Sequence, residues 1–128
     1  MPRPVHFEIH AAEPDRAIKF YESVFGWKAQ RYGDMEYWGL LTGADAEPGI
    51  NGAITKRRGP APEDGQPLNS WGVTIEVDDV DSYFSKALSA GGREAMAKFP
   101  VSGVGWVAYF KDTEGNIVGL HQPDANAR

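Results

Sequence analysis

The 128-residue sequence has no cysteine, no long apolar run and few basic residues. The absence of cysteine excludes disulfides, thiolate metal sites and cysteine nucleophiles, and it is typical of proteins from a reducing cytoplasm. No segment approaches the roughly 20 apolar residues of a membrane span, and the N-terminus lacks the apolar run of a signal peptide. Acidic residues outnumber basic ones by 18 to 13, which gives a net charge of −5. We therefore expect a cytoplasmic protein that binds neither nucleic acid nor a membrane.

The chain does contain enough apolar material for a core. Hydrophobic residues make up 41% of the sequence, and they include four Trp, five Tyr and six Phe. Disordered chains hold few aromatic residues, so this composition indicates a globular protein. A length of 128 residues is typical of one domain, and we expect a single domain over residues 1–128.

A strand pattern opens the chain between Val5 and His10, where apolar and polar side chains alternate. Successive side chains of a strand point to opposite faces, so the apolar odd positions share one face and the even positions share the other. The polar face then holds three ionisable side chains: His6, Glu8 and His10. Such a row is of functional interest only if the sheet curls and the polar face lines a cavity.

The remaining pattern follows the order strand, helix and three strands, twice over. The first helix is expected from Pro14, a residue that suits a first helical turn, to Gly26, which suits a helix end. The second is expected from Asp78 to the pair Gly91-Gly92. Runs with strand character are residues 5–10, 27–32, 36–42, 50–57, 71–77, 93–99, 105–111 and 116–122.

The two halves of the chain match each other at a shift of 66 residues. This shift aligns Gly26 with Gly92 (26 + 66 = 92) and Gly49 with Gly115 (49 + 66 = 115). Chance likeness between two units would not keep the helix-ending and the turn glycines in register together, so we infer an internal repeat. The repeats cover residues 4–58 and 69–123, and the proline-rich stretch 59–68 is expected to link them.

Several short motifs give the chain a resemblance to a known superfamily. They are His6-Phe7-Glu8-Ile9, Ala17-Ile18-Lys19-Phe20-Tyr21, Phe25-Gly26-Trp27, Pro48-Gly49-Ile50-Asn51-Gly52, and Gly105-Trp106 with Lys111-Asp112-Thr113-Glu114-Gly115-Asn116. Together with the tandem βαβββ order, they make nearly the whole chain similar to the vicinal oxygen chelate superfamily of glyoxalases, extradiol dioxygenases, and fosfomycin and bleomycin resistance proteins. The resemblance implies an α+β fold in which two curled sheets, or half-barrels, enclose a small-molecule cavity faced by the polar row. It also implies a homodimer.

The metalloenzymes of this superfamily hold their metal with residues of the first and last strands of the repeats. The resemblance maps these places onto His6, its counterpart Gly72 (6 + 66 = 72), Gly119, and its counterpart Ala53 (119 − 66 = 53). Only His6 has a side chain that can bind a metal. We therefore expect no cofactor, and we expect the small residues to leave space in the cavity. The alternative is a rearranged site of His6, Glu8 and His121 that holds Zn, Ni, Mn or Fe.

Three functions remain open on these grounds. The first is metal-free binding of a small, partly aromatic organic ligand, as in bleomycin resistance proteins. The second is a divalent-metal-dependent lyase, isomerase or dioxygenase of the glyoxalase or extradiol type, and the third is a metal-free enzyme with Glu8 or His6 as general base. The residues expected to contact the ligand are His6, Glu8, His10, Trp38, Thr74, Glu76, Trp106 and His121.

Overall fold

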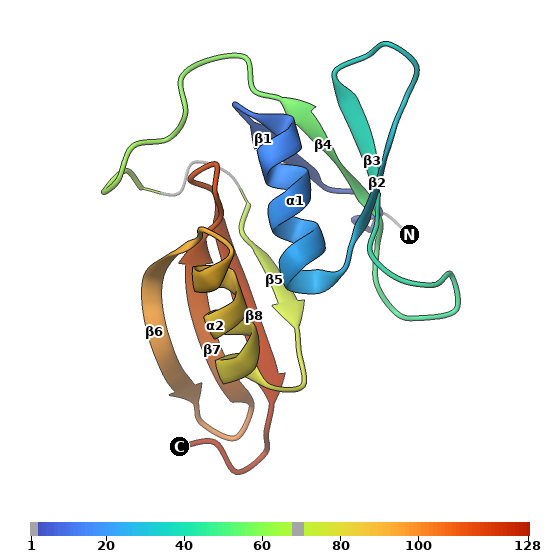
Figure 1. Cartoon of the computed structure of the whole chain (residues 1–128). Helices are drawn as coiled ribbons and strands as arrows, with labels where there is room; N and C mark the ends of the chain where they lie inside the picture. The colour runs from blue at the N-terminus through green and yellow to red at the C-terminus, as the bar shows by residue number, and fades with distance from the viewer. Residues whose placement is uncertain (1–2, 68–70) are drawn as a thin grey trace. The chain divides into compact units, whose positions relative to one another are not determined.

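The computed structural model of the protein describes residues 3–67 and 71–128. These divide into two compact units, Met1–Ala61 and Pro62–Arg128, each built from one strand, one helix and three further strands (Figure 1). The expected α+β fold of two βαβββ modules is therefore confirmed. The assignment of one domain with a linker at 59–68 stays a prediction. In the part of the chain that is described, neither helix is long and apolar enough to cross a membrane.

The N-terminal unit contains a four-stranded sheet in the order β1-β4-β3-β2. Its elements are β1 (Glu8–Ala11), α1 (Pro14–Phe25), β2 (Lys28–Arg31), β3 (Tyr37–Leu41) and β4 (Gly52–Lys56). The expected start of the first strand at residue 5 is wrong, because Glu8 pairs with Ala53 and β4 offers only Gly52 before it. The Phe7 carbonyl still accepts a hydrogen bond from the Ala53 N–H, at 2.9 Å.

Helix α1 begins and ends where the sequence predicts. Pro14 lies in the first turn, where a helix needs no N–H donor. Gly26 adopts the left-handed conformation at φ 75°, and its N–H donates to the Glu22 carbonyl at 2.9 Å. The buried residues of the helix recur at helical spacing: Ala17, Phe20, Tyr21 and Val24. They form the apolar side that packs on the sheet.

Helix α1 covers one face of its sheet, and Phe7 shows which face this is. The Phe7 ring lies 5.8 Å from Trp27, and Trp27 stacks on Tyr21 of α1 at 5.3 Å, measured between ring centroids. The same Phe7 ring covers Gly52, where an added Cβ would lie 2.6 Å from it. Since side chains alternate along β4, Ala53 points away from the helix. We call this opposite side the helix-free face.

The C-terminal unit repeats this architecture with a sheet in the order β5-β8-β7-β6. Its elements are β5 (Val73–Glu76), α2 (Val80–Ser89), β6 (Arg93–Val101), β7 (Gly105–Lys111) and β8 (Ile117–Pro123). Thr74 pairs with Gly119 in parallel, as Glu8 pairs with Ala53. Since 8 + 66 = 74 and 53 + 66 = 119, the register of the strands repeats at the shift found in the sequence.

Helix α2 packs on the face of β8 to which Gln122 points. Asp79 caps the helix by accepting a hydrogen bond from the Ser82 N–H at 3.2 Å. The N–H of Val80, the first residue of the helix, donates to the Gln122 side-chain carbonyl at 2.9 Å. Side chains alternate along β8, so Gly119 and His121 point to the helix-free face of this sheet.

The Lys111–Asn116 motif forms the turn between β7 and β8. Asp112 is buried, and its carboxylate accepts hydrogen bonds from the backbone N–H groups of Glu114 (2.8 Å) and Asn116 (2.9 Å). The Asn116 side chain donates to the same carboxylate at 3.2 Å. The motif therefore has a structural role, because a buried carboxylate that organises a turn is not available to a ligand.

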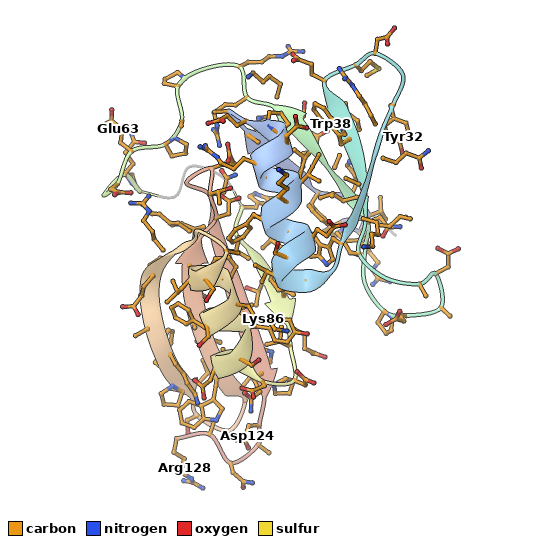
Figure 2. The ribbon with its side chains drawn as sticks, viewed as in Figure 1. Tyr32, Trp38, Glu63, Lys86, Asp124 and Arg128 are labelled. Carbon is orange, nitrogen blue, oxygen red and sulfur yellow. The ribbon has the colours of Figure 1, made fainter. Side chains whose placement is uncertain are left out.

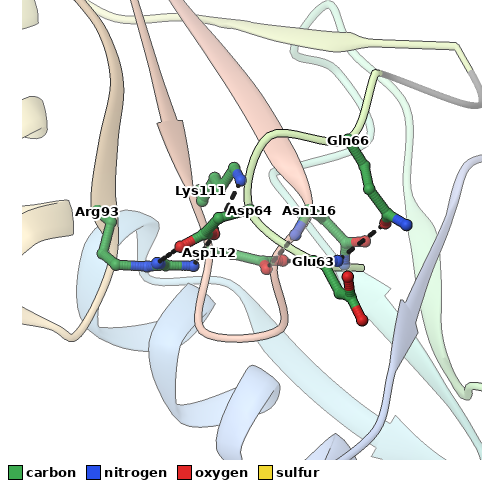
Figure 3. A network of polar contacts seen from close by, with 7 residues as sticks. All are labelled: Glu63, Asp64, Gln66, Arg93, Lys111, Asp112 and Asn116. Atoms are coloured by element: carbon green, nitrogen blue, oxygen red, sulfur yellow. Dashed lines mark hydrogen bonds and ion pairs between the residues drawn. The ribbon is translucent and has the colours of Figure 1, made fainter. Parts of the chain in front are cut away.

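The segment before β5 is attached to the C-terminal sheet by Asp64 (Figure 3). Its carboxylate accepts hydrogen bonds from both Arg93, at 2.8 Å for Nη2, and Lys111, at 3.1 Å. These hydrogen bonds, the one from Arg93 more than the one from Lys111, lower the pKa of Asp64 from 3.8 to about 2. Part of the stretch that the sequence predicts as a linker is thus tied to β6 and β7.

Candidate ligand-binding site

The helix-free face of the N-terminal sheet gathers polar side chains from two strands. Glu8 pairs with Ala53 across the β1–β4 ladder. Tyr37 and Gly39 of β3 pair with Thr55 and Ala53 of β4. Paired residues point to the same face, so Glu8 and Tyr37 share a face on which Gly39 and Ala53 are small.

Tyr37 links the two polar residues that the sequence places in this row. Its hydroxyl lies 2.9 Å from Nε2 of His6, and the carboxylate of Glu8 is near enough to influence its pKa. Burial raises the pKa of Tyr37, and the negative charge of Glu8 raises this pKa further. We call these three residues the His6–Tyr37–Glu8 chain. The structure thus brings His6 and Glu8 together through a residue that the sequence did not assign to the site.

His10 lies at the edge of this group. Its Nε2 is 4.0 Å from Glu8 Oε1, and the two side chains are 50% and 44% exposed. A pair this exposed contributes little to stability, because water screens it. His10 is nevertheless on the same face as Glu8, as alternation along β1 predicts.

Tyr32 lies against the same face from the turn after β2 (Figure 2). A Cβ added at Gly39 would lie 2.9 Å from the Tyr32 hydroxyl, so the Tyr32 ring extends over this glycine. The rings of Tyr32 and Tyr37 are 5.7 Å apart and tilted by 34°. Neither tyrosine is among the ligand contacts expected from the sequence. Their position depends on the pairing of β2, β3 and β4, which alternation within one strand does not reveal.

The C-terminal sheet places three of its four expected ligand contacts, Thr74, Glu76 and His121, on its own helix-free face. Thr74 and Glu76 of β5 pair with Gly119 and His121 of β8. The Nε2 atom of His121 is buried and has no hydrogen-bond partner among the residues described. An unsatisfied buried imidazole nitrogen is costly unless another group reaches it.

Gly119 does not leave the open space that its small size suggested. A Cβ at this position would lie 2.8 Å from Thr74 Oγ1 and 2.9 Å from Tyr109 Cε1. These side chains come from the strands on either side of β8. The place where metalloenzymes of the superfamily have a ligand is therefore filled by neighbouring side chains.

The two tryptophans expected at the ligand lie on the helix-covered faces of their sheets. Trp38 alternates with Tyr37 and Gly39, and its ring holds the guanidinium of Arg31 at 5.0 Å (Figure 2). Trp106 pairs with Gln122, the residue that bonds α2. The Trp106 indole N–H donates to Asp124 at 3.0 Å, and Lys98 lies 4.7 Å above its ring. Neither ring shares a face with the other expected contacts of its sheet, Glu8 in one and Thr74 and His121 in the other, because alternation along β3 and β7 turns it the other way.

No metal ligand set forms within residues 3–67 and 71–128. No three His, Asp or Glu side chains in these segments gather as they would around one ion. His6 and Glu8 belong to the N-terminal unit and His121 to the C-terminal one. The His6, Glu8 and His121 alternative stays a prediction.

Relatives of known sequence are similar to most of the chain. "Putative glyoxylase CFP32" of Mycobacterium tuberculosis is 30% identical over 119 residues, which are 93% of this chain and 45% of that protein. "Anthracycline biosynthesis protein DnrV" of Streptomyces peucetius is 27% identical over 120 residues, 88% of this chain and 44% of that protein. The chain thus spans less than half the length of these relatives.

Solved structures show the same fold. The fosfomycin resistance protein FosX of Listeria monocytogenes matches with a TM-score of 0.72 at 17% identity, over 97% of this chain and 94% of that one. A glyoxalase I mutant from Zea mays matches with a TM-score of 0.68 at 23% identity, over 92% of this chain and 45% of that one. The model of one family covers residues 3–120. The chain therefore belongs to the Glyoxalase/Bleomycin resistance protein/Dioxygenase superfamily.

Proposed function

We propose that the protein binds a small organic ligand on the helix-free face of its N-terminal sheet, without a tightly held metal ion. The observation that supports this most is the His6–Tyr37–Glu8 chain. Its three side chains bring an imidazole, a phenol and a carboxylate together, beside the small residues Gly39 and Ala53. A few converging polar groups next to room for a ligand are typical of small-molecule sites.

The surroundings of this chain favour a partly aromatic ligand. The rings of Tyr32 and Tyr37 lie 5.7 Å apart, and the Tyr32 ring is more than half exposed. Tyrosine rings bind flat apolar groups with their faces and hydrogen-bond with their hydroxyls. His10 beside Glu8 adds a further polar group at the edge of the site.

The residues present do not fit the metal site of the superfamily. Three of the four places for ligands hold Gly72, Ala53 and Gly119, which have no side-chain donor atom, and Gly119 is covered by Thr74 and Tyr109. At the fourth place, Nε2 of His6 is engaged by the Tyr37 hydroxyl. Metal ligation by this nitrogen would require breaking that hydrogen bond. These observations support ligand binding by hydrogen bonds.

Truncation of the polar residues tests this function. A thermal-shift screen of small aromatic alcohols, amines and acids supplies a ligand, whose affinity is then measured by calorimetry. We expect His6→Ala and Glu8→Ala to weaken binding by about 1–3 kcal/mol, since each removes a hydrogen-bonding group. Glu22→Ala is the matched control, because Glu22 lies on α1 and pairs with Lys28. Equal affinity in all three variants would contradict the proposed site.

A second candidate function is supported by the same three residues. A histidine beside a hydroxyl, with a carboxylate on the same face of the sheet, provides groups that can act as a general base. In that case the protein is a metal-free enzyme with His6 or Glu8 as the base. Turnover of a bound ligand, lost in His6→Ala without loss of ligand binding, distinguishes the enzyme from a binding protein.

A further inference from the structure

Two cationic side chains of the C-terminal sheet meet on its helix-free face. Arg93 of β6 pairs with Lys111 of β7 across the antiparallel ladder, so the two side chains point to the same face. Lys111 alternates along β7 with Tyr109, whose ring lies against the position of a Cβ on Gly119. Since Gly119 points to the helix-free face, both cations lie on that face as well. We call Arg93 and Lys111 the cation pair.

The cation pair holds one carboxylate, that of Asp64, in a geometry by which proteins recognise oxyanions (Figure 3). The Arg93 guanidinium donates through both of its terminal nitrogens to the two carboxylate oxygens, at 2.8 Å for Nη2. Lys111 Nζ adds a third hydrogen bond at 3.1 Å. A guanidinium fork beside an ammonium group suits carboxylates and phosphates. Among the described residues, Asp64 is the only acid paired with either cation, so two positive charges face one negative charge.

The segment that supplies Asp64 is fixed to the sheet at few points. We call residues 62–67 the strap. Two hydrogen bonds between Glu63 and Gln66 lie within the strap itself. Within the described residues, the hydrogen bonds from positions 63–67 to β6 and β7 all come from Asp64. The side chains of Arg93 and Asp64 are 57% and 64% exposed, so water and dissolved ions compete for these bonds. An external anion can therefore replace Asp64 without unfolding the sheet.

We propose that the cation pair is a binding site for organic phosphates, and that Asp64 occupies this site as an internal ligand which the phosphate displaces. A phosphate monoester carries about 1.5 to 2 negative charges near neutral pH and has three acceptor oxygens. It therefore balances both cations, whereas Asp64 balances one. Met96 pairs with Tyr109 beside the cation pair and is 52% exposed, which offers apolar surface to the organic part of the ligand. The site belongs to the C-terminal unit and does not depend on the site proposed for the N-terminal sheet.

Titration of the ¹⁵N-labelled full chain with phenyl phosphate tests this site. The backbone amide signals of β6 and β7 are followed near neutral pH at constant ionic strength. We expect a saturable shift in the wild type. Asp64→Asn removes the internal ligand and should bind phenyl phosphate about 2- to 30-fold more tightly, the range that two exposed ion pairs represent. Arg93→Gln removes the guanidinium fork and should abolish the saturable shift.

Glu63→Gln is the matched control, because it removes the same charge one position away from Asp64 and leaves both ion pairs of the cation pair in place. We expect it to bind phenyl phosphate as the wild type does. An equal gain in Glu63→Gln and Asp64→Asn overturns the inference, since general electrostatics would then explain the gain. The inference is overturned as well if Asp64→Asn gains no affinity or shows no saturable shift, or if Arg93→Gln still binds.

Two further probes test the ligand class in Asp64→Asn. Benzoate carries a single negative charge and should bind more weakly than phenyl phosphate, and the neutral benzyl alcohol should not bind. Benzoate that binds as tightly as phenyl phosphate, or benzyl alcohol that binds at all with saturation, overturns the assignment to organic phosphates.

Discussion

Substituting Gly119 by alanine is expected to destabilise the protein, although alanine is the better residue in an ordinary strand. The added Cβ would lie 2.8 Å from Thr74 Oγ1 and 2.9 Å from Tyr109 Cε1, inside normal contact distance. Overpacking of this kind costs about 1–3 kcal/mol. The lower backbone entropy of alanine in the unfolded chain offsets about 0.5–1 kcal/mol of this. Taking the middle of each range, we expect a net loss of about 1 kcal/mol in the free energy of unfolding.

Urea denaturation followed by circular dichroism measures this change, with two further variants for comparison. Gly59→Ala is the matched control, because nothing lies within 4 Å of a Cβ at that glycine. We expect its free energy of unfolding to differ from wild type by less than about 0.5 kcal/mol. Thr74→Ala removes the nearest clashing atom, so the double variant should lose less than the sum of the two single changes. A Gly119→Ala variant as stable as Gly59→Ala would refute the crowding at this position.

Two other features of the structure lead to predictions. Asp64 has a pKa of about 2 in the folded protein against 3.8 otherwise, so its ion pairs with Arg93 and Lys111 contribute stability above pH 4 that is lost as the pH falls toward 2. At neutral pH the Asp64→Asn variant should therefore have a lower free energy of unfolding than the wild type, and this free energy should fall less steeply between pH 4 and pH 2. Identical acid-denaturation curves for the two proteins would contradict this linkage. Each sheet has two edges within its own unit, β1 and β2 in one and β5 and β6 in the other. We expect a homodimer to cover part of this surface, so light scattering at micromolar concentration should give about twice the mass of the chain, and a monomer mass would overturn the prediction.

The fold could be predicted from the sequence because its signals are local. Pro14 and Gly26 bracket α1, and both the alternation of apolar residues and the repeat of 66 residues appear in the strands as paired. The start of β1 could not be predicted in this way. Its limit at Glu8 is set by where β4 begins, and β4 is more than 40 positions later in the chain. Strand ends depend on a partner that local patterns do not specify.

The candidate site could be predicted only in part. Alternation along the first strand placed Glu8 and His10 on one face, and it is the face without the helix. Tyr37 was missed because its approach to Glu8 requires the register of three strands, β1, β4 and β3. Trp38 was included for the chemistry of its ring, whereas its place beside Tyr37 in the same strand puts it on the opposite face.

The small residues at the superfamily's metal positions also do not suffice to predict free space in the site. Glycine at position 119 has no side chain to project into the site, and this predicts space for a ligand. In the folded unit, Thr74 and Tyr109 of the adjacent strands lean into that space. A glycine in a sheet interior often marks the close approach of neighbouring groups, and the neighbours become known only with the register.

Metal analysis of the native protein tests metal-free ligand binding most directly. Protein purified without chelator is examined by elemental analysis, alongside His6→Ala prepared in the same way. We expect zinc, nickel, manganese and iron far below one equivalent per chain in both, because Ala53 and Gly119 supply no ligand and Tyr37 engages His6. Near-stoichiometric metal in the wild type that is lost in His6→Ala would contradict the proposed function and indicate a rearranged metal site.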